Sequence, residues 1–154
     1  EFIYYWAHRL MHSEPALYSI HKHHHLSIVP TPKTSVTFLW SEHLFYDLLF
    51  ALPVILPAFF GEGCLLVVLL YVPLFDVVNS LGHTNLEMFP EWYLDSPLFP
   101  FFYCSSFHAV HHHSNPKANF ALFVPLYDMM FGTYSEIHTR RNFHAAKKTA
   151  MLHK

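Results

Sequence analysis

The sequence predicts an all-α fold, an integral-membrane helical bundle with a dimetal histidine site at its cytosolic face. Two observations carry the prediction. The 154-residue chain has 15 histidines, more than its 9 lysines and arginines together, and they gather in groups with helical spacing. Charged residues make up only 13% of the chain, against roughly 25% in an average soluble domain. The formal net charge of −2 gives no electrostatic basis for binding nucleic acid.

Three groups of histidines have spacings that put their members on one face of a helix. Residues three or four apart on a helix lie above one another. The first group reads His-x-x-x-His, and the second and third each read His-x-x-His-His. The members that share a face are His8 and His12, then His21, His24 and His25, and finally His108, His111 and His112. Pro15 is expected to open the helix that carries the second group.

Two apolar segments between the second and third groups predict a helical hairpin in the membrane. A helix is expected over residues 35–60, apolar from Leu44 onward, then a turn at 61–63 and an apolar helix from Cys64 to Val78. The apolar lengths, roughly 22–26 Å at about 1.5 Å per residue, fall short of the about 30 Å of a hydrocarbon layer. A spanning and a half-inserted hairpin are both open, and a buried helix pair in a soluble protein is the alternative.

Basic residues set the expected orientation of this hairpin. Arg9, Lys22 and Lys33 lie near the first histidine groups, and further basic residues lie in 139–154, whereas the turn carries only Glu62. By the positive-inside rule, the histidines face the cytosol and the turn faces away from it.

Composition also suggests a division of the chain. Residues 1–138 are expected to form the membrane catalytic domain, with earlier membrane helices upstream of Glu1, because the chain starts inside an apolar helix. Residues 139–154 are polar and basic and are expected to be a loosely ordered tail. The loop from Pro90 to Tyr103 is rich in proline and aromatic residues and is expected to lie at the membrane interface. Its candidate anchors are Trp92, Tyr93 and Phe99 to Phe102.

A polar stripe interrupts the end of the second apolar segment. Asp76, Asn79 and His83 stand at i, i+3 and i+7, and ionisable residues at such depth usually face a site. His83 is therefore the ninth candidate metal ligand. We expect Asp76 and Asn79, the candidate catalytic residues, to orient His83 from outside the ligand set.

The number and spacing of the imidazoles favour a metal site. Neutral imidazole binds zinc, iron and copper well, and nine ligands are enough for two ions that each keep an open position. His23 and His113 point off the shared faces, and His138, His144 and His153 lie in or beside the tail, so none of these is expected to bind metal. Arg9 stands where a zinc-protease helix needs its glutamate, and no Glu-x-x-His di-iron motif occurs. Neither cysteine, Cys64 nor Cys104, indicates a disulfide framework or a zinc site.

In these histidine groups and the segments around them, the sequence resembles the fatty acid hydroxylase / sterol desaturase superfamily of integral-membrane, oxygen-dependent dimetal enzymes. Within it, the likeness is greatest to the plant wax-forming aldehyde decarbonylases and related lipid oxidases. The resemblance covers about residues 1–136. Besides the histidine groups, the matching stretches are Glu1 to Trp6, Leu17 to Ser19, Glu42-His43, Asn79 to Glu87, Ser106 to His108 through Pro125 to Asp128, and Phe131 to Thr133.

The resemblance implies an endoplasmic-reticulum membrane enzyme that holds two iron ions, or zinc in the purified protein. It implies a lipid substrate in the bilayer, O2, and electrons from NAD(P)H through cytochrome b5 or its reductase. It carries the ligand role to His8, His12, His21, His24, His25, His83, His108, His111 and His112. Asn79 departs from the pattern, because fatty acid hydroxylases have a histidine there; its amide oxygen could still bind metal or a bound water.

The hypothesis that follows is an O2-dependent lipid oxidoreductase of the hydroxylation or desaturation type, acting on a fatty acyl, fatty aldehyde or sterol substrate. An alkane-forming, aldehyde decarbonylase-like enzyme is the alternative, less favoured because those enzymes carry a further soluble domain after the membrane domain. A membrane metal-binding or transport protein is an alternative from another class. It would need a polar path on both sides of the site, and the turn near Gly61 offers none. An inactive homologue would be expected to have lost histidines from its groups.

Overall fold

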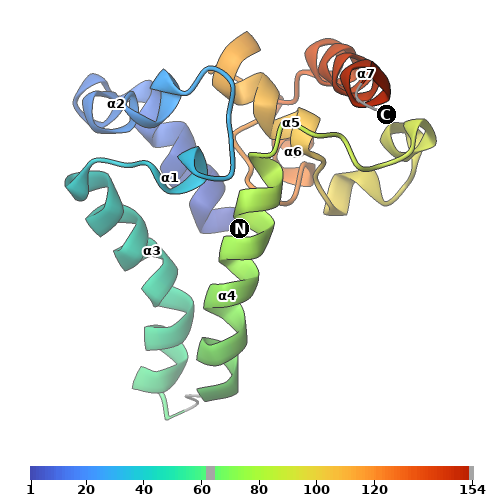
Figure 1. The fold of residues 1–154 in the computed structure, drawn as a ribbon. Helices are drawn as coiled ribbons and strands as arrows, with labels where there is room; N and C mark the ends of the chain where they lie inside the picture. The colour runs from blue at the N-terminus through green and yellow to red at the C-terminus, as the bar shows by residue number, and fades with distance from the viewer. Residues whose placement is uncertain (62–64, 153–154) are drawn as a thin grey trace.

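The chain folds into a helical head from which one long helical hairpin projects (Figure 1). The computed structural model describes residues 1–61 and 65–152, and every regular element within them is helical, which confirms the all-α prediction. The α-helices are α1 (Phe2–Ser13), α2 (Pro15–His21), α3 (Trp40–Phe59), α4 (Leu65–Gly82), α5 (Ser105–Ala109), α6 (Leu126–Met130) and α7 (Glu136–Leu152). Four 3-10 turns, η1 (His24–Leu26), η2 (Thr34–Val36), η3 (Glu91–Asp95) and η4 (Phe99–Phe101), and a π-helical turn, η5 (Val110–Ser114), complete the set.

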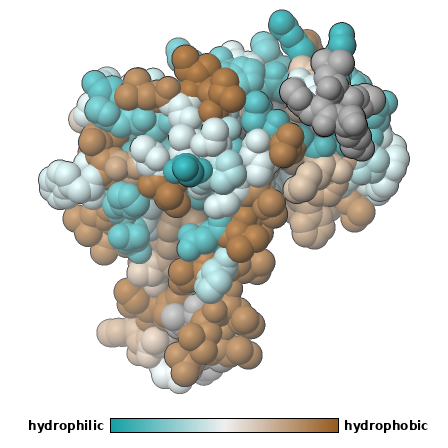
Figure 2. All heavy atoms as spheres, viewed as in Figure 1, coloured by the Kyte–Doolittle hydropathy of each residue, from teal (hydrophilic) through white to brown (hydrophobic). Residues whose placement is uncertain are grey.

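The hairpin consists of α3 and α4, which diverge toward the head (Figure 1). Its surface is largely hydrophobic, whereas that of the head is mixed (Figure 2). Within the described residues, Trp40–Phe59 is the one helix long and apolar enough to cross a membrane, and only 11% of its apolar window is buried. A shorter apolar helical stretch covers Leu69–Gly82. The expected turn at 61–63 lies, apart from Gly61, outside the described residues.

The first hairpin helix begins later than the sequence suggests. Thr34 closes a separate turn, because its hydroxyl donates to the Thr31 carbonyl at 2.9 Å and accepts from the Thr31 amide at 2.7 Å. Leu39 is then extended, so α3 starts at Trp40 rather than near residue 35. Ser, Thr and Asn side chains that bond nearby backbone groups favour such turns over helix.

The core of the head is aromatic. It is built around Tyr5, Phe99, Phe107 and Phe143, which are all almost completely buried. Tyr93 belongs to the same core, and its hydroxyl donates to the Phe102 carbonyl. The expectation that Tyr93 and Phe99 anchor the protein at a membrane interface is therefore wrong. The other candidate anchors, Trp92, Phe101 and Phe102, are exposed.

The end of the chain is ordered helix rather than a loose tail. Helix α7 runs from Glu136 to Leu152 and packs against α5, the helix that carries the third histidine group. Thr139 and Phe143, four residues apart, are fully buried on the face of α7 that meets the head. The expected loosely ordered tail is therefore wrong for residues 139–152, because an apolar contact of this kind fixes the helix despite its basic composition.

Removing the Phe143 ring tests whether α7 is part of the folded unit. Phe143→Ala should lower the free energy of unfolding by about 3–5 kcal/mol, the range for a fully buried phenylalanine. The measurement is denaturant unfolding of the purified protein in detergent. Ile137→Ala, at a position that is 80% exposed on the same helix, is the control and should change stability by less than about 0.5 kcal/mol. Equal stability of the two variants would contradict the docking of α7.

Candidate metal centre

The first histidine group lies on a regular helix. His8 and His12 are on α1, four residues apart, and their ring centroids are 5.1 Å apart. The His8 side chain is buried and the His12 side chain is half-buried. Helix α1 packs against α2, so the face that carries both rings is turned toward the second group.

The second group is divided by a break in the helix. Helix α2 ends at His21, and the 3-10 turn η1 begins at His24. His21 and His25 direct their Nε2 atoms toward each other, 3.0 Å apart. His24 instead contacts His112 of the third group, with ring centroids 4.6 Å apart. The helical pattern predicted one shared face for all three rings, but the break sends His24 elsewhere.

The third group is divided by a π-helical turn. Helix α5 carries His108, and the chain then continues as η5 from Val110, where the Asn115 amide bonds the Val110 carbonyl at 2.8 Å. Such a turn holds one residue more than an α-helical turn, and it is often found at functional sites. His108 and His112 remain together, with Nε2 atoms 3.2 Å apart, while His111 points to the other side, against His8.

The nine predicted ligands therefore form two adjacent clusters. The first cluster is His8, His12, His21, His25 and His111, and the second cluster is His24, His83, His108 and His112. Within each cluster, one nitrogen from every ring lies within 4.8 Å of all the others. His25 and His112 stack across the boundary with ring centroids 5.0 Å apart. Neither His23 nor His113 belongs to a cluster, as expected from their place off the shared faces; His153 lies outside the described residues.

The proton positions in the first cluster fit a cation. The Phe120 carbonyl accepts a hydrogen bond from His8 Nδ1 at 2.7 Å, and the Glu42 carboxylate accepts one from His21 Nδ1 at 2.5 Å. Each neutral ring carries one proton, so both Nε2 atoms are lone pairs, and they lie only 3.0 Å apart. Two lone pairs at this distance repel, whereas two nitrogens bound at about 2.0–2.1 Å to one ion stand about 3 Å apart.

The His111 ring adds a third lone pair. Its Nδ1 donates to the Ala118 carbonyl at 2.8 Å. Its Nε2 is buried and has no hydrogen-bond partner among the residues that the structure describes. An unsatisfied buried nitrogen is unfavourable, and a metal ion in the first cluster would satisfy it. The residues present therefore fit a transition-metal ion.

Burial keeps these imidazoles neutral. Removal from water lowers the pKa of His8 to about 3 and that of His25 to about 4, and the neighbouring imidazoles add to the effect. In the second cluster, burial lowers the pKa of His83 to about 4 and holds the pKa of His108 well below its ordinary range. Metal ligation needs the neutral ring, so near neutral pH no proton has to leave before these rings bind metal.

One short loop orients a ring in each of two histidine groups. The Ala118 and Phe120 carbonyls hold His111 and His8, and Asn119 stands between them with a left-handed φ of 55°. This conformation is uncommon outside glycine, although asparagine tolerates it. The Asn119 side-chain amide donates to the Thr139 hydroxyl of α7 at 3.0 Å and to the Phe107 carbonyl at 2.8 Å. The loop, and through it the first cluster, is therefore tied to α7.

A buried carboxylate fixes the other side of this loop. Asp128 of α6 accepts the backbone amides of Phe120 and Ala121, both at 2.8 Å, and the Thr133 hydroxyl at 2.6 Å. The Tyr5 hydroxyl in turn bonds Thr133 Oγ1 at 2.8 Å. A hydrogen-bond chain thus connects α1, which carries His8, with the carbonyl that orients His8.

The carboxylate next to His21 was missed as a site residue by sequence reasoning. Glu42, at the start of α3, is completely buried, and one of its oxygens accepts the His21 Nδ1 proton. A carboxylate in this place fixes the ring orientation and raises the basicity of the other nitrogen. The signal available in the sequence was an acidic residue at the start of a strongly apolar helix, where a buried charge needs a partner.

The side chains of Asp76 and Asn79 do not orient His83 as expected. The His83 Nδ1 donates to the main-chain carbonyl of Asn79 at 2.8 Å, one helical turn back. The Asn79 amide group donates instead to the Ser35 carbonyl at 3.2 Å, and Asp76 is exposed on the hairpin. The helix backbone itself supplies the acceptor, which the spacing of side chains could not reveal.

A helical head that gathers nine imidazoles in two adjacent, largely buried clusters is consistent with the class of histidine-rich proteins that hold two metal ions. The family model described as "Fatty acid hydroxylase" matches residues 1–133. The chain belongs to this family, which confirms the resemblance found in the sequence.

Curated plant proteins are similar to the chain. It is 42% identical over 135 residues to very-long-chain aldehyde decarbonylase GL1-7 of Oryza sativa subsp. japonica, covering 86% of the chain and 21% of that protein. It is 40% identical to protein CER1-like 1 of Arabidopsis thaliana, with the same coverage. It is 37% identical over 138 residues to very-long-chain aldehyde decarbonylase CER1 of Arabidopsis thaliana, covering 88% of the chain and 22% of that protein. The chain thus spans about a fifth of the length of these relatives. No solved structure matches it.

Replacement of His111 tests the first cluster. His111→Ala removes a buried lone pair, so metal content should fall by about one ion of a pair, measured by elemental analysis of purified protein. His113→Ala is the matched control, because its exposed ring lies two residues away and outside both clusters. A His111→Ala protein with undiminished metal content would contradict the assignment.

Replacement of Glu42 tests the contact between its carboxylate and the His21 ring. Glu42→Gln retains an oxygen that can accept the His21 proton but makes it neutral, so metal affinity should drop about 10- to 100-fold, the usual range for such contacts. Competition with a chelator measures the affinity. Glu14→Gln, at the exposed junction between α1 and α2, should leave it unchanged. If both variants bound metal like the parent protein, Glu42 would merely satisfy a buried ring.

Proposed function

We propose that this chain is the metal-binding catalytic region of a membrane oxidoreductase that converts very-long-chain aldehydes to hydrocarbons. Two buried histidine clusters in a fatty acid hydroxylase family chain carry the proposal. The relatives named as very-long-chain aldehyde decarbonylases supply the substrate class. They favour this reaction over the hydroxylation or desaturation that the sequence alone put first.

The cofactors in this proposal are two iron ions, with O2 and electrons delivered by a protein such as cytochrome b5. The ions would supply activation of oxygen and attack on a lipid, chemistry that no side chain provides. The chain's own part is to present nine neutral nitrogens, to fix His8, His21, His83 and His111 by their Nδ1 protons, and to exclude water by burial.

A cavity between the hairpin helices gives the substrate a route to the clusters. It has a volume of about 530 Å³, within the usual range for small-molecule sites; we call it the hairpin cavity. Its walls include Phe50 of α3, Tyr71 of α4, and Tyr4 and Phe38 at the head. The Tyr4 ring contacts His8 and the Phe38 ring contacts His24, with centroids 5.3 and 4.8 Å apart. A hydrocarbon in this cavity therefore lies one side chain away from both clusters.

The hairpin supports a membrane location, which we propose to be the endoplasmic reticulum with the clusters on the cytosolic side. Leu48, Ile55 and Phe59 of α3 and Leu66 and Leu70 of α4 are each at least half exposed, as expected of side chains that face lipid. These lipid-facing side chains offer a metal ion no ligand, so a transport function is not favoured.

Product analysis tests the proposed function. Membranes that contain the full-length protein, given a very-long-chain aldehyde, O2 and an electron donor, should form a hydrocarbon that lacks the carbonyl carbon. That carbon should leave as formate, while the donor's electrons reduce the remaining oxygen atom to water. His108→Ala should reduce the product at least about 100-fold, because it removes a buried ligand, whereas His23→Ala should not. Products that keep every carbon and gain a hydroxyl or a double bond would support the hydroxylation or desaturation alternative. Equal product without oxygen would rule out the oxidase.

A further inference from the structure

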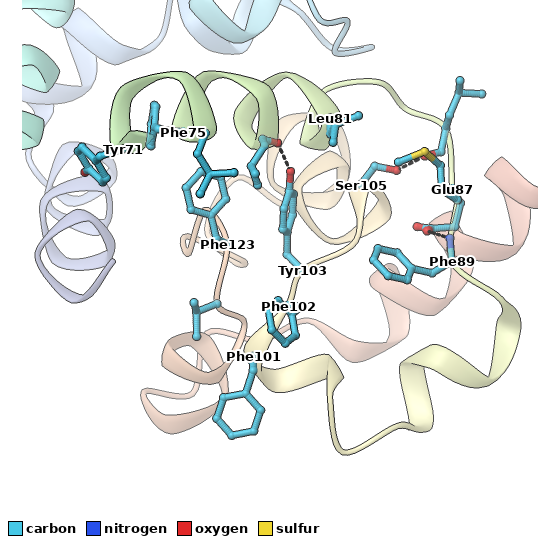
Figure 3. A pocket seen from close by; sticks show the side chains of 15 residues that line it. Tyr71, Phe75, Leu81, Glu87, Phe89, Phe101, Phe102, Tyr103, Ser105 and Phe123 are labelled. Atoms are coloured by element: carbon cyan, nitrogen blue, oxygen red, sulfur yellow. Dashed lines mark hydrogen bonds between the residues drawn. The ribbon is translucent and has the colours of Figure 1, made fainter. Parts of the chain in front are cut away.

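A second cavity of about 480 Å³ lies on the other side of α4. Figure 3 shows it between α4 and the aromatic segment Phe101 to Tyr103; we call it the aromatic cavity. The Tyr103 hydroxyl donates to the Val78 carbonyl and so ties this segment to α4. Met88, Phe101 and Phe102 are more than half exposed at its edge, so the cavity opens through apolar side chains.

Away from Tyr71, which also lines the hairpin cavity, the polar side chains of the aromatic cavity are already bonded within the protein. The Ser105 hydroxyl donates to the Leu86 carbonyl at 2.6 Å. The Glu87 carboxylate accepts the Phe89 amide at 3.0 Å and the Ser106 hydroxyl at 2.7 Å. A polar ligand would lose its bonds to water here without replacement. The chemistry that fits this cavity is therefore plain hydrocarbon.

The two cavities share one wall. On α4, the residues that line only one cavity project to one side or the other of a stripe of residues that lines both cavities. Val72, Asp76 and Asn79 line the hairpin cavity, and Leu74, Val78 and Leu81 line the aromatic cavity. Tyr71 and Phe75, four residues apart on the stripe between them, line both. Phe75 contacts Phe50 on one side and Phe123 on the other, with ring centroids 4.1 and 5.4 Å apart.

We propose that the aromatic cavity holds the far end of the hydrocarbon chain of a very-long-chain substrate, and that Phe75 determines which chains reach it. This placement of the hydrocarbon chain rests on the proposed function. The polar end occupies the hairpin cavity beside the clusters, where His43, Asp47 and Asn79 contribute to the lining. A medium chain ends within that cavity, and a very long one passes Phe75 into the aromatic cavity.

Photo-crosslinking can locate the bound hydrocarbon chain without any catalytic turnover. The probes are a medium-chain and a very-long-chain fatty alcohol, each with a diazirine at its terminal carbon, added without oxygen to the metal-loaded full-length protein in membranes. The very-long-chain probe should label the peptide with Met88 or the one with Phe101 to Tyr103. The medium-chain probe should label α3 near Val54 and Ile55, which line only the hairpin cavity.

Two variants of α4 should change labelling of the aromatic cavity in opposite directions. Leu74→Trp places a large ring in the aromatic cavity at a position that is 63% exposed, so folding should tolerate it. It should lower very-long-chain labelling of the aromatic cavity about tenfold, the effect of losing one or two buried methylene groups. Medium-chain labelling should stay unchanged. Phe75→Ala should let shorter probes reach the aromatic cavity. The controls are Leu66→Trp and Phe59→Ala, exposed hairpin positions that line neither cavity.

Each result decides for or against the proposal. Very-long-chain labelling that stays on α3 in the parent protein, or that Leu74→Trp leaves unchanged, overturns it while the product assay of the proposed function stands. Labelling of neither cavity by either probe overturns it as well. Correct labelling in a protein that yields no hydrocarbon product separates the two, because the lipid site is then present and the proposed reaction is wrong.

Discussion

Hydrogen bonds from imidazole Nδ1 atoms to fixed acceptors orient four of the nine cluster histidines, and much of the head depends on these bonds. Nine rings packed together would repel if protonated and would be unsatisfied if free to rotate. Phe120, Ala118 and Asn79 offer main-chain carbonyls to His8, His111 and His83, and Glu42 offers a carboxylate to His21. Each bond chooses the tautomer and aims the other nitrogen inward. The inward lone pairs follow from these bonds. The lowered pKa values of His8 and His83 come from burial, which outweighs the opposite effect of the bonds to the Phe120 and Asn79 carbonyls.

Those acceptors must themselves be held, and this requirement explains much of the head. The turn at Asn119 is maintained by Asp128 from one side and by Thr139 of α7 from the other. Glu87 similarly accepts the amide and hydroxyl of Ser106 near the start of α5, the helix that presents His108. Buried polar groups of this kind are stable only when fully bonded. The sequence from Asn119 to Thr139 thus serves the clusters without providing any ligand.

Features set by residues close together in the sequence could be predicted, whereas contacts between residues far apart in the sequence could not. The all-helical class, the apolar hairpin and the nine histidines come from local spacing, and the structure brings all nine together. The division of two groups between the clusters depends on a helix break after His21 and a π-helical turn at His111, which spacing alone does not encode. Glu42 and the carbonyl of Phe120 act across separations that only the folded chain closes. Asp76 shows the opposite error, because its spacing suggested a contact with His83, whereas its side chain lines the cavity between the hairpin helices.

The hairpin and the clusters also constrain each other. Helices α3 and α4 diverge toward the head (Figure 1), which leaves room for a cavity of about 530 Å³ directly below the imidazoles. Their inner ends supply Glu42 and the Asn79 carbonyl, so the helices that line the cavity also orient one ring in each cluster. A displacement of either helix would change the cavity and a ligand together. A hydrocarbon bound between them, as we propose, would therefore be positioned by the same helices that orient the candidate metal ligands.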